Sequence, residues 1–341
     1  MEQETSRILI ETMVRKTLRE IEHSPERSIR NLIDMALHFS TGRFQQNFFR
    51  IAQTMLKNEK SAYYSLIRDI VSHTEREHLV TFGMNLGYNS CTKGARMIRQ
   101  IEATQGFNVP WSITLEIESA VFRAQLGRYH ALIAQGEQLG IHTWILFAQD
   151  IPRELMFLIE SHPDSSFILF CDPLDLNTPV LEYAAELHNL MLAVRYGTGV
   201  AEACTLLRAT RLLYAVYYPY NAADESFLTS GELFHVIEPM HPAFTALLPD
   251  LDCPITTCHT VYQAITHARE QQVYQTIPFE LFLDCSRIDG IISDDACAVG
   301  FDRHGMLYTH HTRRTEPCFD LFQNDLRTIL QKAFPKKEGE L

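Results

Sequence analysis

The runs WSITLEI at Trp111–Ile117, TWILFA at Thr143–Ala148 and SFILFC at Ser166–Cys171 are short, apolar and separated by segments with helical periodicity. Apolar runs of this length, bounded by turn-forming residues, indicate buried strands. Because strand and helix alternate at roughly 25 to 30 residues per unit, we expect βαβ units, whose right-handed crossovers make the strands parallel. This stretch therefore predicts an α/β fold.

The same alternation continues toward the C-terminus. Further strands are expected at Leu190–Arg195, Leu212–Tyr218, Phe244–Leu248 and Phe279–Cys285. Repeated strand-helix units fit either a TIM-like barrel or a doubly wound sheet, and their spacing alone does not separate the two.

The segments on either side of this region have a different sequence pattern. Residues 1–107 carry helical periodicity, and the turn-forming residues of Phe82–Cys91 should interrupt these helices before a last helix, from about Lys93 to Thr104, ends at Gly106. We therefore expect an N-terminal helical region over 1–107.

A small C-terminal extension is expected over 287–341. Asp289 and Gly290 predict a turn, Ala298–Tyr308 reads as a hairpin that turns at His304 and Gly305, and Phe319–Phe334 resembles a closing amphipathic helix. The strand-helix region is then 108–286.

Composition excludes several classes of protein. The chain has 341 residues, of which 46% are hydrophobic and 21% charged, so it can bury a large core. Its formal net charge of −12 disfavours binding to a nucleic-acid backbone or to an anionic membrane, since both require basic surfaces. No apolar run is long enough to cross a bilayer. We expect no nucleic-acid partner and no membrane.

The cysteines indicate a reducing compartment. The eight cysteines form no CxxC pair, and the polar, periodic start MEQETSRILIETMVRKTLRE does not read as a secretory signal. We therefore expect a cytoplasmic protein whose thiols are reduced and in several cases buried.

A family resemblance rests on the order of these segments. Four segments resemble the first three strand-helix units of radical S-adenosylmethionine (SAM) proteins: Asn108–Ile117, Ala131–Thr143, Pro152–Ile159 and Ser166–Asp172. A fifth segment, Asn189–Gly197, is similar to the fourth strand of those proteins. The likeness runs from about Asn108 to Phe334. It implies a parallel (β/α) partial or full TIM-like barrel between 108 and 286.

The same resemblance makes the absence of a cysteine motif informative. The family needs a CxxxCxxC loop after the first strand, because three thiolates hold a [4Fe-4S] cluster that binds the cofactor. Here Leu115–Leu126 contains no cysteine, and the glycine-rich end of the second strand is replaced by Ala148–Pro152. Since both cofactor contacts are missing together, the resemblance implies a degenerate relative with no cluster, no metal and no catalytic residue of the radical SAM type.

The carboxyl ends of the strands are where a barrel builds its pockets. The candidate ligand-binding residues there are Glu116, Gln149, Asp150, Asp172, Arg195 and Tyr217, with Tyr220 and Asp284 also at expected strand ends. Arg195 stands in an otherwise apolar strand, so a buried guanidinium would need an anionic partner. An internal pair with Asp172 or Glu116 and an anionic ligand are both open.

A metal site built from other residues is the weaker alternative. Cysteines and histidines gather loosely in two places: Cys253, Cys258, His259 and His267, and then Cys285, Cys297, Cys318, His304, His310 and His311. Neither spacing matches a zinc motif, so buried thiols and surface imidazoles are the expected interpretation.

Two function classes follow. The first is a non-catalytic binding or scaffolding protein whose partner is an active radical SAM homologue or a peptide. The second is an enzyme in which the emptied barrel mouth is reused, with Glu116, Asp150 or Asp172 as acid or base and Arg195 holding a small anion.

Overall fold

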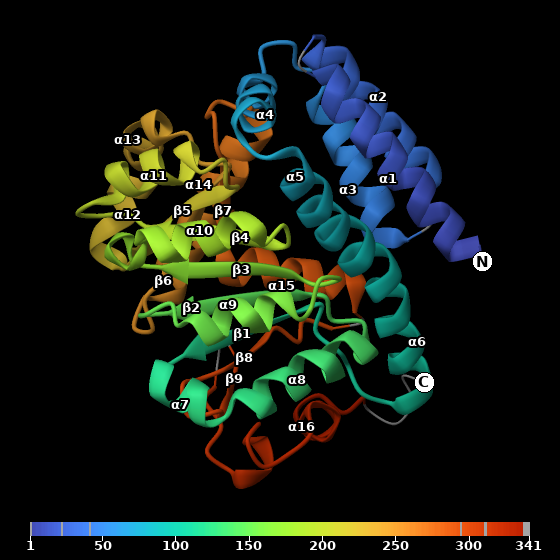
Figure 1. Cartoon of the computed structure of the whole chain (residues 1–341), viewed down its shortest axis with the longest axis vertical. Coiled ribbons are helices and arrows are strands. Elements are labelled where there is room, and N and C mark those ends of the chain that lie inside the picture. The colour runs from blue at the N-terminus through green and yellow to red at the C-terminus, as the bar shows by residue number, and fades with distance from the viewer. Residues whose placement is uncertain (1, 22, 41, 294, 310–311, 337–341) are drawn as a thin grey trace.

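The computed structural model describes residues 2–21, 23–40, 42–293, 295–309 and 312–336 (Figure 1). At its centre is one curled, mostly parallel sheet. Its strands are β1 (Ser112–Ile117), β2 (Thr143–Ala148), β3 (Ser166–Cys171), β4 (Leu190–Arg195), β5 (Tyr214–Tyr220), β6 (Phe244–Pro249), β7 (Ile277–Glu280), β8 (Val299–Phe301) and β9 (Leu307–Tyr308).

The strand order separates the two folds that the sequence left open. The order is β7-β6-β5-β4-β3-β2-β1-β8-β9, and all pairs are parallel except β8 with β9. A doubly wound sheet would reverse direction at a switch point, whereas here β1 to β7 follow one another without reversal. The sheet is thus a half-barrel, consistent with a partial TIM-like barrel and open between its outer strands.

Helices connect the strands in the expected way. They are α7 (Ser119–Ala124), α8 (Leu126–Leu139), α9 (Arg153–Glu160), α10 (Thr178–Glu186), α11 (Val200–Ala209), α12 (Glu225–Thr229), α13 (Glu232–Ile237), α14 (Ile255–Gln271) and α15 (Leu281–Ile292), with short 3₁₀ turns η2 (Pro173–Asp175), η3 (Ala222–Asp224) and η4 (Glu238–Met240). Figure 1 shows α8, α9, α10 and α11 along one face of the sheet, with α15 on the far side.

Two expectations about the end of the strand run were wrong. The strand expected at Phe279–Cys285 ends at Glu280, and Asp289 and Gly290 lie inside α15 rather than in a turn. The backbone N–H of Trp111, just before β1, donates to Asp289 Oδ1 at 2.8 Å, and its indole Nε1 donates to the Cys285 carbonyl at 3.3 Å. Helix α15 therefore runs from the end of β7 to the start of β1.

The N-terminal region is helical, as expected. It contains α1 (Glu2–Ile21), α2 (Pro25–Phe39), α3 (Arg43–Met55), α4 (Ala62–His73), α5 (Arg76–Met84), the π-helix η1 (Asn85–Gly94) and α6 (Ala95–Gln105). Gly106 ends α6 in the left-handed conformation at φ 70°, which confirms that helix end. The expected break at Phe82–Cys91 was wrong, because α5, η1 and α6 follow one another without interruption.

The helix pair α5 and η1 covers the amino-terminal edge of the sheet (Figure 1). The Asn85 amide donates to the carbonyls of Pro163 and Ser165, at 2.8 and 3.0 Å, and the Asn89 amide donates to the Asp164 carbonyl at 2.9 Å. His78 Nε2 contacts the Leu190 carbonyl at the start of β4. These side chains contact carbonyls of the loop before β3 and the first carbonyl of β4, and so tie the helix to the sheet.

The C-terminal segment joins the sheet. The expected hairpin is confirmed as β8 and β9, and β8 also pairs in parallel with β1. The expected closing helix is shorter than Phe319–Phe334: it comprises the 3₁₀ turn η5 (Pro317–Phe319) and then α16 (Leu326–Ala333). None of the helices in the described ranges is long and apolar enough to cross a membrane.

Candidate functional site

The sequence-predicted residues gather at the carboxyl edge of the half-barrel. Glu116 is the penultimate residue of β1, Gln149 and Asp150 directly follow β2, Asp172 follows β3, Arg195 ends β4 and Tyr217 lies opposite Arg195 in β5. Asp284 does not belong to this edge, because it lies on α15. Tyr220 ends β5, but its side chain is fully buried and its hydroxyl points to Glu280 at 3.4 Å.

An aromatic ladder runs across one face of the sheet and consists of Phe147, Phe170 and Tyr217. The Phe147 and Phe170 rings stack with centroids 4.5 Å apart, and Phe170 meets Tyr217 edge to face at 5.1 Å. Strand neighbours such as Leu146 and Leu169 point to the opposite face and are fully buried. The strand register places Glu116 beside Phe147, so Glu116 lies on the same face of the sheet as the ladder. This is the inward face of the half-barrel, opposite to the face on which Leu146 and Leu169 lie.

Glu116 has a partner that the sequence did not suggest. Its Oε1 lies 3.7 Å from Nη2 of Arg313, whose guanidinium also lies over the ring of Tyr308 in β9. Burial raises the pKa of Glu116, while the charge of Arg313 opposes the shift. The C-terminal segment therefore supplies the cation beside β1.

Arg195 is exposed, and the prediction of a buried guanidinium was wrong. Within the described ranges it makes no ion pair with Asp172 or Glu116. Tyr217 beside it is 9% exposed, and burial raises its pKa to about 12. A charged group that projects freely from a strand end beside a phenol can meet a ligand without breaking an internal pair.

An acid rim lies at the ends of β2 and β3 and consists of Asp150, Asp172 and Asp175. Asp172 caps η2 by accepting the Leu174 N–H at 3.1 Å, whereas Gln149 and Asp150 are exposed. Burial raises the pKa of Asp175, and the carboxylates of Asp172 and Asp150 add to the rise. The rim would attract a cationic group.

The residues after β1 do not fit an iron-sulfur cluster. The Glu118 side chain accepts the Ala120 N–H and caps α7, so the chain turns into a helix where the radical SAM motif would place its thiolates. Cys171 is the thiol at the end of β3, and burial raises its pKa well above the usual range. Among the described residues no group of three His, Cys, Asp or Glu side chains is arranged to hold a metal. His310 and His311 lie outside those residues.

Glu280 is a buried carboxyl that the sequence interpretation missed. It ends β7, is fully buried, and its Oε2 caps α15 by accepting the Leu283 N–H. Burial raises its pKa to about 7. The signal that could have found it is the helical spacing of Leu281, Cys285, Ile288 and Ile292, which places the strand end at Glu280.

Comparisons with known proteins concern the fold. No protein-family model matches the sequence, and no curated protein matches it. The chain is similar to solved structures of SuiB from Streptococcus suis. The form bound to S-adenosylmethionine superposes with a TM-score of 0.51 at 7% identity, over 70% of this chain and 68% of that one.

Two further SuiB structures align with TM-scores of 0.47. The first covers 68% of this chain and 69% of that chain at 6% identity. The second, bound to the precursor peptide SuiA, covers 72% of each at 7% identity. At such low identity the likeness of the S-adenosylmethionine-bound form is one of fold alone, and the chain has a radical SAM-like fold.

Proposed function

We propose that this chain is a non-catalytic binding protein whose half-barrel holds a short basic and apolar peptide segment at its carboxyl edge. The observation that carries the proposal is the end of β1, where a Glu118-capped helix stands in place of three thiolates. Without thiolates the fold has no means of holding the cluster of a radical SAM enzyme.

The inward face supports a peptide as the ligand. Phe147 is the partly exposed ring of the aromatic ladder and can contact an apolar or cationic side chain, whereas Phe170 and Tyr217 are buried behind it. Glu116 lies at the β1 end of the ladder. The acid rim adds negative charge beside it, in a protein whose net charge is −12. A basic partner is therefore favoured electrostatically.

Exposed apolar side chains occur in loops of the same edge. Leu174 after β3 is 80% exposed, Leu251 after β6 is 86% exposed, and Ile255 at the start of α14 is 49% exposed. Large apolar side chains that remain in water beside a polar rim are typical of binding surfaces. A peptide that covers Leu174 and meets the acid rim would use both properties.

A displayed library of random peptides, selected on the full chain, tests this proposal. We expect enriched peptides to pair Lys or Arg with a large apolar residue, and Asp150→Lys and Leu174→Ser each to weaken their binding about tenfold. The matched controls are Glu182→Lys and Phe157→Ser, which place the same changes on exposed positions of α10 and α9. Failure to enrich such peptides, or equal affinity in test and control variants, would contradict the proposal.

A second candidate function is an enzyme whose barrel mouth takes a small anion. The observation that favours it is the exposed Arg195 beside Tyr217. Because Arg195 makes no ion pair within the described ranges, Arg195→Ala should leave the thermal unfolding temperature within a few degrees. If small carboxylates raise the unfolding temperature of the wild type but not of this variant, the result favours an enzyme that binds a small anion over a peptide-binding protein.

A further inference from the structure

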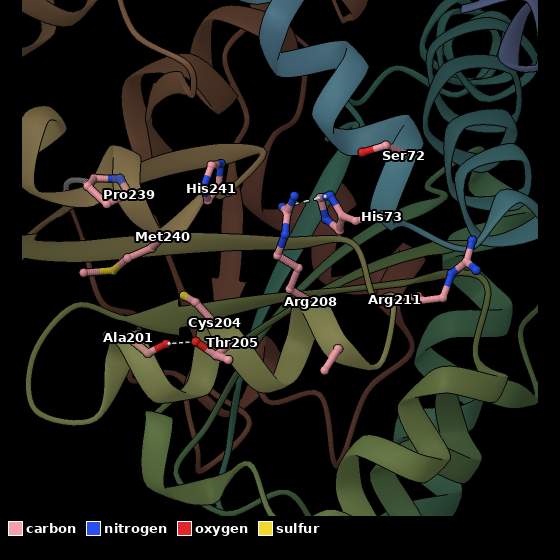
Figure 2. A pocket seen from close by; sticks show the side chains of 11 residues that line it. Ser72, His73, Ala201, Cys204, Thr205, Arg208, Arg211, Pro239, Met240 and His241 are labelled. Carbon is pink, nitrogen blue, oxygen red and sulfur yellow. Dashed lines mark hydrogen bonds between the residues drawn. The ribbon is translucent and has the colours of Figure 1, made fainter. Parts of the chain in front are cut away.

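A cavity of about 650 Å³ lies at the edge of the sheet opposite to the proposed peptide site (Figure 2). Its walls come from the end of α4, from α11 and from η4, next to the starts of β5 and β6. Ligand pockets in proteins span about 300–1,000 Å³, so the cavity is large enough for a small organic molecule.

The polar part of the wall is organised around one carboxylate behind it. Asp69 of α4 is not a lining residue; its Oδ2 accepts from Arg208 Nη1 at 2.8 Å and lies 3.5 Å from His73 Nδ1 and 3.8 Å from His241 Nδ1. Burial alone would raise the pKa of Asp69, but the hydrogen bond and charge of Arg208 lower it, so the group is ionised. The carboxylate thus holds the Arg208 guanidinium, whereas His73 Nδ1 lies 2.7 Å from the backbone carbonyl of Asp69.

The wall itself carries only positive and neutral groups. Arg208 and Arg211 line it with His73 and His241, and none of the lining residues is Asp or Glu. Counting the two guanidinium groups against Asp69 leaves one positive charge even when both imidazoles are neutral. Although the net charge of the chain is −12, no acidic side chain lines this cavity, so its local charge favours the binding of an anion over that of a cation.

Two of the wall residues have an unusual backbone. Arg211 has φ 58° and His241 has φ 54°, and among the described residues only Gln272 is a further non-glycine residue with positive φ. This conformation costs on the order of 1 kcal/mol for a side chain with a Cβ, and glycine would avoid the cost. Each of the two stands at a helix end, Arg211 after α11 and His241 after η4, where a left-handed residue commonly ends a helix.

We propose that this cavity binds a small phosphate monoester that carries an apolar body. The two guanidinium groups and the two imidazoles offer more donors than a singly charged carboxylate requires, and they suit a phosphate dianion. The hydroxyls of Ser72 and Thr205 already donate to the carbonyls of Asp69 and Ala201, each at 2.8 Å. The remainder of the wall would contact the organic part and consists of Ala201, Cys204, Ala209, Pro239 and Met240. This site is independent of the peptide site.

Calorimetric titration of the full chain with phenyl phosphate, inorganic phosphate, benzoate and phenol tests the proposal. We expect phenyl phosphate to bind more tightly than inorganic phosphate or benzoate, and phenol not to bind. Arg211→Ala and His241→Ala should each lower the affinity for phenyl phosphate about tenfold, which corresponds to the loss of one charge-assisted hydrogen bond. Arg128→Ala, an exposed arginine on α8, is the matched control and should bind like the wild type.

A second variant separates binding from folding. Arg211→Gly removes the side chain and relieves the positive φ, so it should unfold at a temperature no lower than the wild type and still lose affinity. The proposal is overturned if phenyl phosphate does not bind, if benzoate binds equally well, or if Arg211 and His241 variants bind like the wild type. It is also overturned if Arg195→Ala rather than the cavity variants abolishes binding, because the anion would then occupy the carboxyl edge.

Discussion

The carboxyl group of Asp289 is a buried acid next to the start of β1. It is fully buried, its Oδ1 accepts the Trp111 N–H, and its Oδ2 has no hydrogen-bond partner within the described residues. Burial raises the pKa of Asp289 well above its usual range, and the neighbouring Glu102 adds to the rise. The folded chain therefore holds a proton on this carboxyl that the unfolded chain releases near pH 4.

This difference makes stability depend on pH. Because the folded pKa lies above the unfolded value, Asp289 favours folding below about pH 4, and its contribution is lost as pH rises toward the folded pKa. Asp289→Asn keeps an acceptor for Trp111 and removes the titration. We expect the variant to gain about 1–3 kcal/mol over the wild type at pH 8 and less at pH 5, measured by urea unfolding.

Asp252→Asn, at an exposed position, is the control for the Asp289 variant. A stability difference between Asp289→Asn and the wild type that shrank with rising pH would show that the Asp289 carboxyl is ionised in the folded chain.

Single residues also mark the limit of prediction for the site. The positions of Glu116, Asp172 and Arg195 at strand ends follow from the apolar runs that precede them. Their partners do not follow, because Arg313 reaches Glu116 from a distant part of the chain, and β4 ends where Arg195 is already exposed. The local sequence pattern predicts which residue ends a strand, whereas tertiary packing determines which side chains that residue contacts.

At the scale of elements, the helix from α5 through η1 to α6 holds the amino-terminal edge together. Gly94 at its centre packs directly on the loop before β2, where a Cβ would clash with the carbonyl oxygen of Gly140. Gly83, one element earlier on the same helix, faces open space. The two glycines therefore have different roles.

Alanine substitution separates those roles. Gly94→Ala should destabilise the chain by about 1–3 kcal/mol, since backbone must move to admit the methyl group. Gly83→Ala should be neutral or stabilise by up to about 1 kcal/mol, because alanine has the higher helix propensity. Chemical denaturation of both variants checks this, and equal effects would show that Gly94 has room.

The same elements show what local sequence can predict. The first four strands of the half-barrel have the bounds expected from their apolar runs, because most of their side chains are buried. The turn-forming residues Asn85 and Asn89 misled the prediction at η1, since their amides bond to the loop before β3 and leave the helix backbone intact. At α15 the apolar residues next to β7 resemble a strand by composition, although their spacing is helical.

At the scale of the whole molecule, the two edges of the sheet differ in chemistry. The carboxyl edge combines an acid rim, an aromatic ladder and exposed leucines, whereas the amino-terminal edge is covered by helices and carries the acid-free cavity wall. The strand order made the half-barrel distinguishable from a doubly wound sheet, which sequence spacing alone could not do. The division into segments 1–107, 108–286 and 287–341 stays a prediction.

We propose that this half-barrel works without an iron-sulfur cluster. Anaerobic reconstitution of the full chain with iron and sulfide, followed by iron quantification and an assay for cleavage of S-adenosylmethionine, tests it most directly. We predict no stoichiometric iron-sulfur absorbance and no cleavage, because no thiolate stands at the end of β1. One cluster per chain together with turnover of the cofactor would contradict the claim.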